Sequence, residues 1–335
     1  MRPDIREKID AVTKIGPERM AAGGWQPPPK SVKIAITTRC PLKCKYCATQ
    51  IHGDMQGRDM DLEFFKAITE DMRYCAVEEI GVFYLGESFA APKLLRECVK
   101  WVKKELGFTW VFLTSNALLA TPSAVEDVIL NGLDSLKWSV NAADPKQYAE
   151  VTGGTEEQFW KSMENIANAW EIRNRLAAKT IISASSIYYD EEQPKRMKPL
   201  LDQYVLPFVD RHYWLPMYTM AMVKKKLEQE TGFIPTVGNS GRIDELTWKP
   251  NRQPIPCWAV FTEGHVRVDG GLSACCFGYD SSMDMGKLNG TNFMREWNSY
   301  GFRKLRMAHL DYIGYNTGTR NSYSLKGTIC ERCME

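Results

Sequence analysis

The 335-residue chain carries almost no excess charge, because its 43 basic residues are nearly balanced by 41 acidic ones, which leaves a formal net charge of +2. A chain this close to neutral produces no strong field towards polyanions, so nucleic acid is a disfavoured partner. The chain also lacks an apolar run near the roughly 18–20 residues that a spanning helix needs, and its N-terminus (MRPDIREKIDAVTKIG) has no apolar signal-peptide core. Internal repeats and low-complexity tracts are absent too. These absences predict a soluble, cytoplasmic protein without a membrane partner.

Cysteine, in contrast, is abundant, with ten residues. In a reducing cytosol, thiols in this number are more typical of metal ligands or catalytic groups than of disulfides. They fall into one short window (Cys40, Cys44, Cys47), a second group near the C-terminus (Cys257, Cys275, Cys276, Cys330, Cys333), and two isolated positions (Cys75, Cys98). The two groups predict two metal sites. The isolated pair lies in helical patterns and is predicted to be buried packing thiols.

Strand and helix patterns alternate through residues 31–218. Strands are expected near 32–36, 79–85, 109–114, 135–140, 180–187 and 212–218, and helices near 62–75, 93–105, 122–131, 156–175 and 192–205. This rhythm predicts right-handed βαβ units and a parallel sheet. Six strands are too few for a closed eight-stranded barrel, so the predicted α/β fold is a partial (β/α)6 parallel barrel. Its ligands should gather at the C-terminal ends of the strands.

Composition divides the chain into four parts. Residues 1–30 form a lead-in that ends in the proline-rich WQPPPK, and 31–218 form the partial barrel. A connector is expected over 219–253, because the alternation stops there. Residues 254–335 then form a small cysteine-bearing module, which is too short to build a large core alone and is expected to be stapled by a metal.

The first cysteine window reads TTRCPLKCKYC and follows the first strand directly. Its CxxxCxxC spacing puts three thiolates on one loop, and three protein ligands on a metal that takes four leave one position open. An open position is typical of a reactive site. Two structural alternatives remain at this point: a zinc knuckle with His52 as the fourth ligand, or a loop of buried free thiols.

The window resembles the radical S-adenosylmethionine (SAM) superfamily, including the aromatic Tyr46 before the last cysteine. The resemblance implies that Cys40, Cys44 and Cys47 hold a [4Fe–4S] cluster whose fourth iron binds SAM. Electron transfer into the sulfonium would then release a 5′-deoxyadenosyl radical, which abstracts a hydrogen atom from a substrate. The resemblance also implies an electron donor of the flavodoxin or ferredoxin type.

The segment EIGVFYLGES resembles the glycine-glycine-glutamate-proline motif that follows the family's second strand. Gly86 and Glu87 match this motif, whereas Leu85 and Ser88 depart from it. The resemblance implies that Glu87 accepts a hydrogen bond from the amino group of SAM. An ordinary strand-to-helix turn is the alternative.

Two later segments resemble the third and fourth strands of the family. VFLTSNALL places Ser115 and Asn116 where the family has threonine-asparagine, which implies that they line the cofactor pocket. In GLDSLKWSVNAADP, Ser139 takes the position of a serine that faces the ribose or carboxylate, and Asn141 stands where aspartate is common. Polar turn groups without a cofactor role are the alternative.

The C-terminal part resembles the auxiliary-cluster domain called SPASM in its long form and twitch in its short form. The resemblance rests on DGG-x3-CC, a following glycine (Gly286), the pair Glu296-Trp297, and Arg306. Because no cysteine lies between positions 276 and 330, the short form with one auxiliary [4Fe–4S] cluster is favoured. Its implied ligands are Cys257, Cys275, Cys330 and Cys333. A zinc ribbon made of the same four thiolates remains the alternative.

The choice of Cys275 over Cys276 rests on register, since the family's ligand follows the Asp269-Gly270 turn after four further residues. Adjacent residues on an extended chain point to opposite sides, so Cys276 is expected to stay free and point away.

The resemblance to family members with the short tail implies an oxidoreductase or isomerase that acts on a small polar substrate, such as an aminosugar or cyclitol, by oxidation, epimerisation or rearrangement. Peptide or protein modification is the main alternative. This alternative is less favoured, because the 30 residues before Ser31 are too few for a separate leader-binding domain. A non-catalytic iron–sulfur electron carrier and a nucleic-acid-modifying enzyme are further alternatives, and the latter has only KSVK and MVKKK as basic patches.

Overall fold

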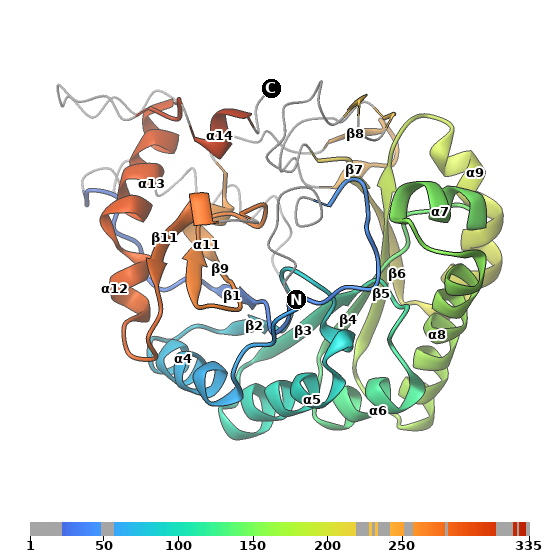
Figure 1. The fold of residues 1–335 in the computed structure, drawn as a ribbon, viewed down its shortest axis with the longest axis horizontal. Helices are drawn as coiled ribbons and strands as arrows, with labels where there is room; N and C mark the ends of the chain where they lie inside the picture. The colour runs from blue at the N-terminus through green and yellow to red at the C-terminus, as the bar shows by residue number, and fades with distance from the viewer. Residues whose placement is uncertain are drawn as a thin grey trace.

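The strands of the partial barrel and those of the C-terminal module join in one curved sheet (Figure 1). A computed structural model describes residues 22–47, 57–218, 228–229, 232–233, 242–250, 257–278, 281–312, 324–326 and 328–332. Within these residues a nine-stranded sheet has the order β11-β10-β9-β1-β2-β3-β4-β5-β6. The barrel strands are β1 (Ser31–Ile34), β2 (Glu79–Gly81), β3 (Trp110–Ser115), β4 (Ser135–Ser139), β5 (Ile181–Tyr188) and β6 (Arg211–Pro216). Neighbouring barrel strands all pair in parallel, so the predicted partial barrel is confirmed.

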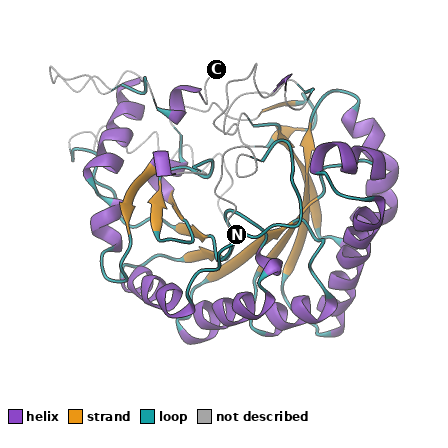
Figure 2. Ribbon diagram, in the orientation of Figure 1, coloured by secondary structure: helices purple, strands orange, loops and turns teal. Residues whose placement is uncertain are grey.

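The helices cover the outer side of this sheet (Figure 2). They are α4 (Leu62–Tyr74), α5 (Pro92–Lys100), α6 (Pro122–Leu130), α7 (Pro145–Thr152), α8 (Glu156–Arg175) and α9 (Gln193–Leu200). Side-chain oxygens of Asp61, Thr121, Asp144 and Thr155 accept backbone N–H groups at the starts of α4, α6, α7 and α8. Such caps satisfy donors that have no partner inside a helix.

Two predicted helices change character near their ends. The segments expected at 93–105 and 192–205 finish as π-helical turns over Trp101–Glu105 and Leu201–Val205. In the second segment Pro199 lies inside α9 and lacks the N–H that would continue the ladder, which accounts for an irregular turn at that place. Cys98 is fully buried, as predicted, whereas Cys75 is only half-buried because it caps the exposed end of α4.

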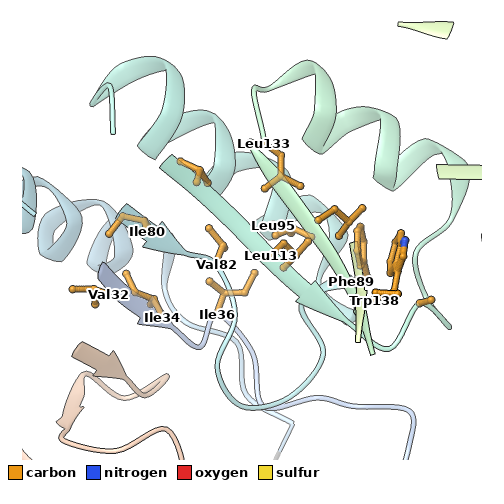
Figure 3. Packing of buried hydrophobic residues seen from close by; sticks show 14 of the residues in the cluster. Val32, Ile34, Ile36, Ile80, Val82, Phe89, Leu95, Leu113, Leu133 and Trp138 are labelled. Carbon is orange, nitrogen blue, oxygen red and sulfur yellow. The ribbon is translucent and has the colours of Figure 1, made fainter. Parts of the chain in front are cut away.

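Apolar side chains at alternate strand positions form the core between sheet and helices (Figure 3). Val32, Ile34, Ile80 and Leu113 have no more than 1% of their surface exposed. Burying one such side chain contributes about 1.5–3 kcal/mol, which fixes the face each strand turns towards the helices. The residues between them therefore face the inner side of the sheet.

The inner face of the barrel becomes polar towards the C-terminal ends of the strands. Thr114, Lys137 and Ser183 lie side by side across β3, β4 and β5 in the pairing register. The next inner positions towards the C-terminal strand ends are Ser139 and Ser185, which are also paired. A polar inner wall thus leads up to the strand ends where ligands are expected.

The C-terminal module continues the barrel sheet. Its strands are β9 (Glu263–Val266), β10 (Gly271–Ser273) and β11 (Asp284–Lys287). β9 pairs in parallel with β1, so Ser31 lies opposite Glu263 and Lys33 opposite His265. β10 and β11 add antiparallel strands at the edge. The module was expected to depend on a metal staple, and its strands are in addition supported by β1.

Arg306, one of the residues on which the SPASM resemblance rests, is buried within this module and has a structural role there. It belongs to α13 (Tyr300–Tyr312), which follows α12 (Phe293–Trp297), while α11 (Ala259–Thr262) and α14 (Ile329–Arg332) complete the helices described there. Its fully buried guanidinium donates to the carbonyl oxygens of Val260 (2.8 Å) and Trp297 (2.9 Å). It also lies 4.2 Å from the ring centroid of Trp297. A buried cation with this many acceptors holds the helices in place.

The end of the lead-in packs on the same module. Gln26 and Asn298 exchange two hydrogen bonds of 2.9 Å, and the indole of Trp297 donates to the carbonyl oxygen of Pro27 at 2.8 Å.

The connector contributes a short hairpin, β7 (Ile243–Asp244) and β8 (Lys249–Pro250). The boundaries between the four predicted parts remain predictions. Within the described residues no helix has the length and apolarity to cross a membrane.

Candidate functional site

The cysteine loop follows β1 at its C-terminal end and is fastened to α7. The backbone N–H groups of Lys43 and Lys45 donate to the last carbonyl oxygens of α7, at 2.8 and 2.9 Å. Helix ends leave such carbonyls without intrahelical partners, so the loop and the helix satisfy each other. This fixes the position of Cys40, Cys44 and Cys47, all of which are partly buried.

The loop's sulfur atoms lie in a setting that disfavours free thiolates. Burial raises the pKa of Cys40 to about 12 and also raises that of Cys44. Bound iron would supply the positive charge that holds these thiols deprotonated. The side-chain amide of Asn116 lies 3.8 Å from the Cys40 sulfur, within reach of a weak hydrogen bond. The all-sulfur donor set therefore fits an iron–sulfur cluster.

No three His, Cys, Asp or Glu side chains among the described residues converge on a single metal ion. A four-iron cluster binds its thiolates through separate irons, so it does not require such convergence. His52, the alternative fourth ligand of a zinc knuckle, lies outside the described residues.

Gly86 brings the loop after β2 directly onto the cysteine loop. Its φ is +76°, and a Cβ at this position would clash with the carbonyl oxygen of Thr37. Glycine is thus required both by the left-handed conformation and by the close backbone approach. The match with the family's glycine therefore has a physical cause in this chain.

Glu87 joins three segments of the site. Its backbone N–H donates to the carbonyl oxygen of Arg39 at 2.8 Å, and its carboxylate accepts from the backbone N–H groups of Phe89 (3.1 Å) and Asn116 (2.8 Å). The side chain is almost fully buried. Burial raises the pKa of Glu87 and the hydrogen bonds from Asn116 and Phe89 counteract it, with a net value above the usual range. The predicted contact with SAM remains a prediction.

A tight turn at the end of β3 contains Ser115 and Asn116, the two residues of this strand that were predicted to line the cofactor pocket. The side-chain oxygens of Ser115 and Asn116 accept from the backbone N–H groups of Ala117 and Leu118, both at 3.0 Å. Ala117 has a φ of +69°, an unfavourable conformation for a residue with a Cβ. The buried amide of Asn165 on α8 donates to the carbonyl oxygens of this turn at 2.8 and 3.1 Å. Sequence reasoning missed Asn165, because one polar residue on a buried helix face has no distinctive pattern.

Tyr46 and Asn141 meet across the site. The side-chain amide of Asn141 donates to the Tyr46 hydroxyl at 3.0 Å, and the Tyr189 hydroxyl donates to the carbonyl oxygen of Asn141 at 3.0 Å. Ser139 occupies the last position of β4, two residues before Asn141. The structure therefore gathers the predicted residues at the C-terminal strand ends. Their contacts with SAM stay predictions.

The second group of cysteines also comes together. Hydrogen bonding to Cys276 and burial raise the pKa of the Cys275 thiol, and the nearby thiols of Cys330 and Cys257 raise it further. The backbone N–H of Phe277 donates to the Cys275 sulfur at 3.4 Å. The thiols of Cys276, Cys330 and Cys257 thus all lie in the neighbourhood of Cys275, and an all-sulfur donor set of this kind fits a second cluster. Cys333, the remaining predicted ligand, lies outside the described residues.

The expected separation of Cys275 and Cys276 is wrong. Their thiols are hydrogen-bonded to each other. The alternation rule does not apply, because β10 ends at Ser273 and residues 275–278 form a turn closed by a 3.0 Å hydrogen bond from Gly278 N–H to the Cys275 carbonyl. Which of the two cysteines binds the cluster remains a prediction.

Tyr84 connects the two cysteine sites. Its hydroxyl lies 2.8 Å from the carbonyl oxygen of Cys275 and 2.7 Å from that of Gly278, and it donates to one of them at a time. Tyr84 stands two residues before Gly86. The loop predicted to bind SAM is therefore in direct contact with the auxiliary cysteine turn, which no local sequence pattern indicated.

Comparison with known protein families supports two iron–sulfur sites in this chain. Residues 34–182 match the radical SAM superfamily, and residues 257–334 match the SPASM iron–sulfur cluster-binding domain. The chain belongs to the radical SAM superfamily and carries a C-terminal SPASM domain. Its cofactors are SAM and [4Fe–4S] clusters, as predicted.

Among individual proteins, the chain is similar to PqqA peptide cyclase from Methylorubrum extorquens, with 28% identity over 169 residues that cover 48% of this chain and 41% of the relative. It is also similar to a probable GTP 3′,8-cyclase from Methanococcus vannielii, with 28% identity over 137 residues, 40% of this chain and 44% of the relative. The matches thus span less than half the length of these relatives. SuiB from Streptococcus suis, solved with its precursor peptide SuiA, shares the fold with a TM-score of 0.61 and 14% identity, covering 99% of this chain and 82% of SuiB.

Proposed function

We propose that this radical SAM enzyme modifies a peptide or protein substrate. The observation that carries the proposal is the similarity to PqqA peptide cyclase, which extends over 48% of the chain. The same fold in SuiB binds a precursor peptide, so this architecture is compatible with a peptide. The small-substrate expectation drawn from the sequence becomes the second candidate.

Residues near the strand ends offer contacts for an extended substrate. Trp248, in the turn between β7 and β8, stacks on Tyr188 at the end of β5 with a centroid distance of 5.2 Å. Trp248 is 36% exposed and Leu246 beside it is 94% exposed. These apolar side chains and the polar inner wall at Lys137 would contact different parts of a peptide.

When bound, the first cluster and SAM supply a 5′-deoxyadenosyl radical. The chain's own residues orient the reactants and exclude water. A hydrogen atom would leave a substrate carbon and form the methyl group of 5′-deoxyadenosine. Isomerisation would return a hydrogen atom to the substrate radical. Oxidation or bond formation within the peptide would instead release one further electron, which the auxiliary cluster would accept, and one proton; the cyclase relatives support bond formation.

Stimulated cofactor cleavage tests this proposal. Anaerobically reconstituted enzyme is supplied with SAM, dithionite and size-separated fractions of an extract from the source cells, and 5′-deoxyadenosine is measured. We expect the peptide-sized fraction to stimulate its formation, and protease treatment of the fraction to abolish the stimulation. A Cys40→Ala variant gives the background.

A small-molecule substrate is the second candidate, favoured by the similarity to probable GTP 3′,8-cyclase. In that case stimulation would reside in the small-molecule fraction and survive protease treatment. That result would overturn the peptide proposal and leave the radical SAM assignment intact.

A further inference from the structure

A largely buried ion pair lies where barrel strand β1 meets β9 of the C-terminal module. The ammonium of Lys33 is 2.6 Å from a carboxylate oxygen of Glu263, and their side chains are 19% and 7% exposed. Because β1 and β9 are in parallel register, Lys33 stands beside His265, which is fully buried. The pair therefore faces the inner side of the extended sheet.

The same lysine lies near the auxiliary cysteines, because His265 beside it pairs in turn with Ser273 of β10, two residues before Cys275. Burial lowers the pKa of Lys33, but Glu263, Cys276 and Cys275 outweigh this, and the net pKa is raised. Lys33 is thus a cation at neutral pH. His265 stays neutral, because burial and the adjacent Lys33 lower its pKa to about 3. Lys33 and Glu263 accordingly bring one positive and one negative charge to this joint.

Stability alone gives little reason for such a pair. Desolvating two charges offsets most of their attraction, and well-packed apolar residues often serve a buried joint equally well. The position of Lys33 near the auxiliary cysteines indicates a different role for the ion pair, an electrostatic effect on the cluster that these cysteines are predicted to hold.

Each one-electron reduction adds one negative charge to an iron–sulfur cluster. A nearby cation stabilises the reduced form and raises the reduction potential, and a nearby anion has the opposite effect. We propose that Lys33 raises the reduction potential of the auxiliary cluster and that Glu263 limits this increase. Lys33 acts through the cluster and is not a catalytic residue. The proposal does not depend on the substrate.

A redox titration followed by electron paramagnetic resonance tests the proposal. The full chain is reconstituted with both clusters, and the auxiliary signal is identified with a Cys40/Cys44/Cys47→Ala triple variant. At a fixed potential we expect Lys33→Met to lower the ratio of reduced to oxidised auxiliary cluster about tenfold, which is about 59 mV for a one-electron couple. Glu263→Gln, which keeps the shape of the side chain and removes its charge, should increase this ratio.

The two variants have opposite expected signs, which separates charge from structural damage. Opening the joint to water would shift both variants in the same direction, and that result would overturn the proposal. Lys33→Arg keeps the charge and should stay near the wild-type potential. Iron content is measured in each variant, and if Lys33→Met does not assemble its auxiliary cluster, an unchanged or lowered potential in Glu263→Gln overturns the proposal on its own.

Discussion

The backbone N–H of Asn116 donates to a carboxylate oxygen of Glu87 at 2.8 Å, which ties the end of β3 to the loop after β2. The backbone N–H of Glu87 in turn donates to Arg39 in the cysteine loop. Phe89 N–H and the Ser115 side chain are further donors to this carboxylate. A carboxylate has about four acceptor positions, so these three bonds leave capacity for one more donor. Glu87 thus supports the local structure and remains available for its predicted contact with the amino group of SAM.

A Glu87→Gln variant should keep its iron and bind SAM more weakly by about 1.5–3 kcal/mol, because a charge-assisted hydrogen bond is lost. The new amide N–H2 would also face the backbone donors of Phe89 or Asn116. Iron analysis and calorimetric titration with SAM measure the two effects. Glu63→Gln, on the exposed face of α4, is the control. Unchanged SAM affinity would remove Glu87 from the cofactor site.

Each of Cys40, Cys44 and Cys47 should be indispensable for SAM cleavage, because each thiolate is predicted to hold one iron. Single alanine variants should form no 5′-deoxyadenosine with SAM and dithionite. Cys75→Ala is the matched control, since this half-buried thiol lies at the end of α4 and 3.9 Å from Asp71. Wild-type product formation in any of the three variants would refute the ligand assignment.

Local patterns predicted much of this fold. Alternation of buried residues such as Val32 and Ile34 marks the first strand, and the cysteine spacing after it marks the metal loop. Asp61 directly precedes the helix expected at 62–75, where a side-chain cap is typical, and it accepts from Phe64 N–H at 2.8 Å. These features involve residues that are close in the chain, so their periodicity and spacing suffice.

Long-range contacts could not be predicted in this way. The bond between Tyr84 and Cys275 joins positions 191 residues apart, and the Lys33–Glu263 pair joins positions 230 apart. Both contacts depend on the pairing of β9 with β1, and the sequence pattern of a strand does not indicate which strand it pairs with. The contact between Cys275 and Cys276 depends on where β10 ends, and boundaries are the least reliable part of a pattern.

His212 should make stability depend on pH. Burial lowers its pKa to about 4, and Ser186 lies 2.9 Å from its Nε2. In the unfolded chain histidine titrates near about 6.5, so between these values the unfolded state binds more protons. The stabilising contribution is complete above the unfolded pKa and is lost as the pH falls through this window. In His212→Gln the decrease in melting temperature from about pH 7 to about pH 5 should be smaller, and an equal decrease would contradict this account.

Ala117→Gly should stabilise the protein by about 0.5–1 kcal/mol, because glycine adopts a positive φ without the steric cost that alanine has, and this gain exceeds the added freedom of the unfolded chain. Anaerobic thermal melting of the holoenzyme measures the change. Ala124→Gly, inside α6, should instead destabilise by about 1 kcal/mol. A lower melting temperature for Ala117→Gly would show that Asn165 and the turn hydrogen bonds already remove the strain.

Iron content should distinguish the two adjacent cysteines. Reconstituted protein should carry about eight irons, and the Cys40/Cys44/Cys47→Ala triple variant about four, because two four-iron clusters account for the two groups of thiolates. In the background of the triple variant, Cys275→Ala should lose the remaining iron and Cys276→Ala should keep it, as the register after Asp269-Gly270 predicts. The hydrogen bond between the two thiols makes Cys276→Ala a sensitive control, since it changes the immediate surroundings of Cys275 without removing the predicted ligand. Iron loss in Cys276→Ala alone would reverse the register, whereas zinc without iron in the triple variant would refute the auxiliary cluster.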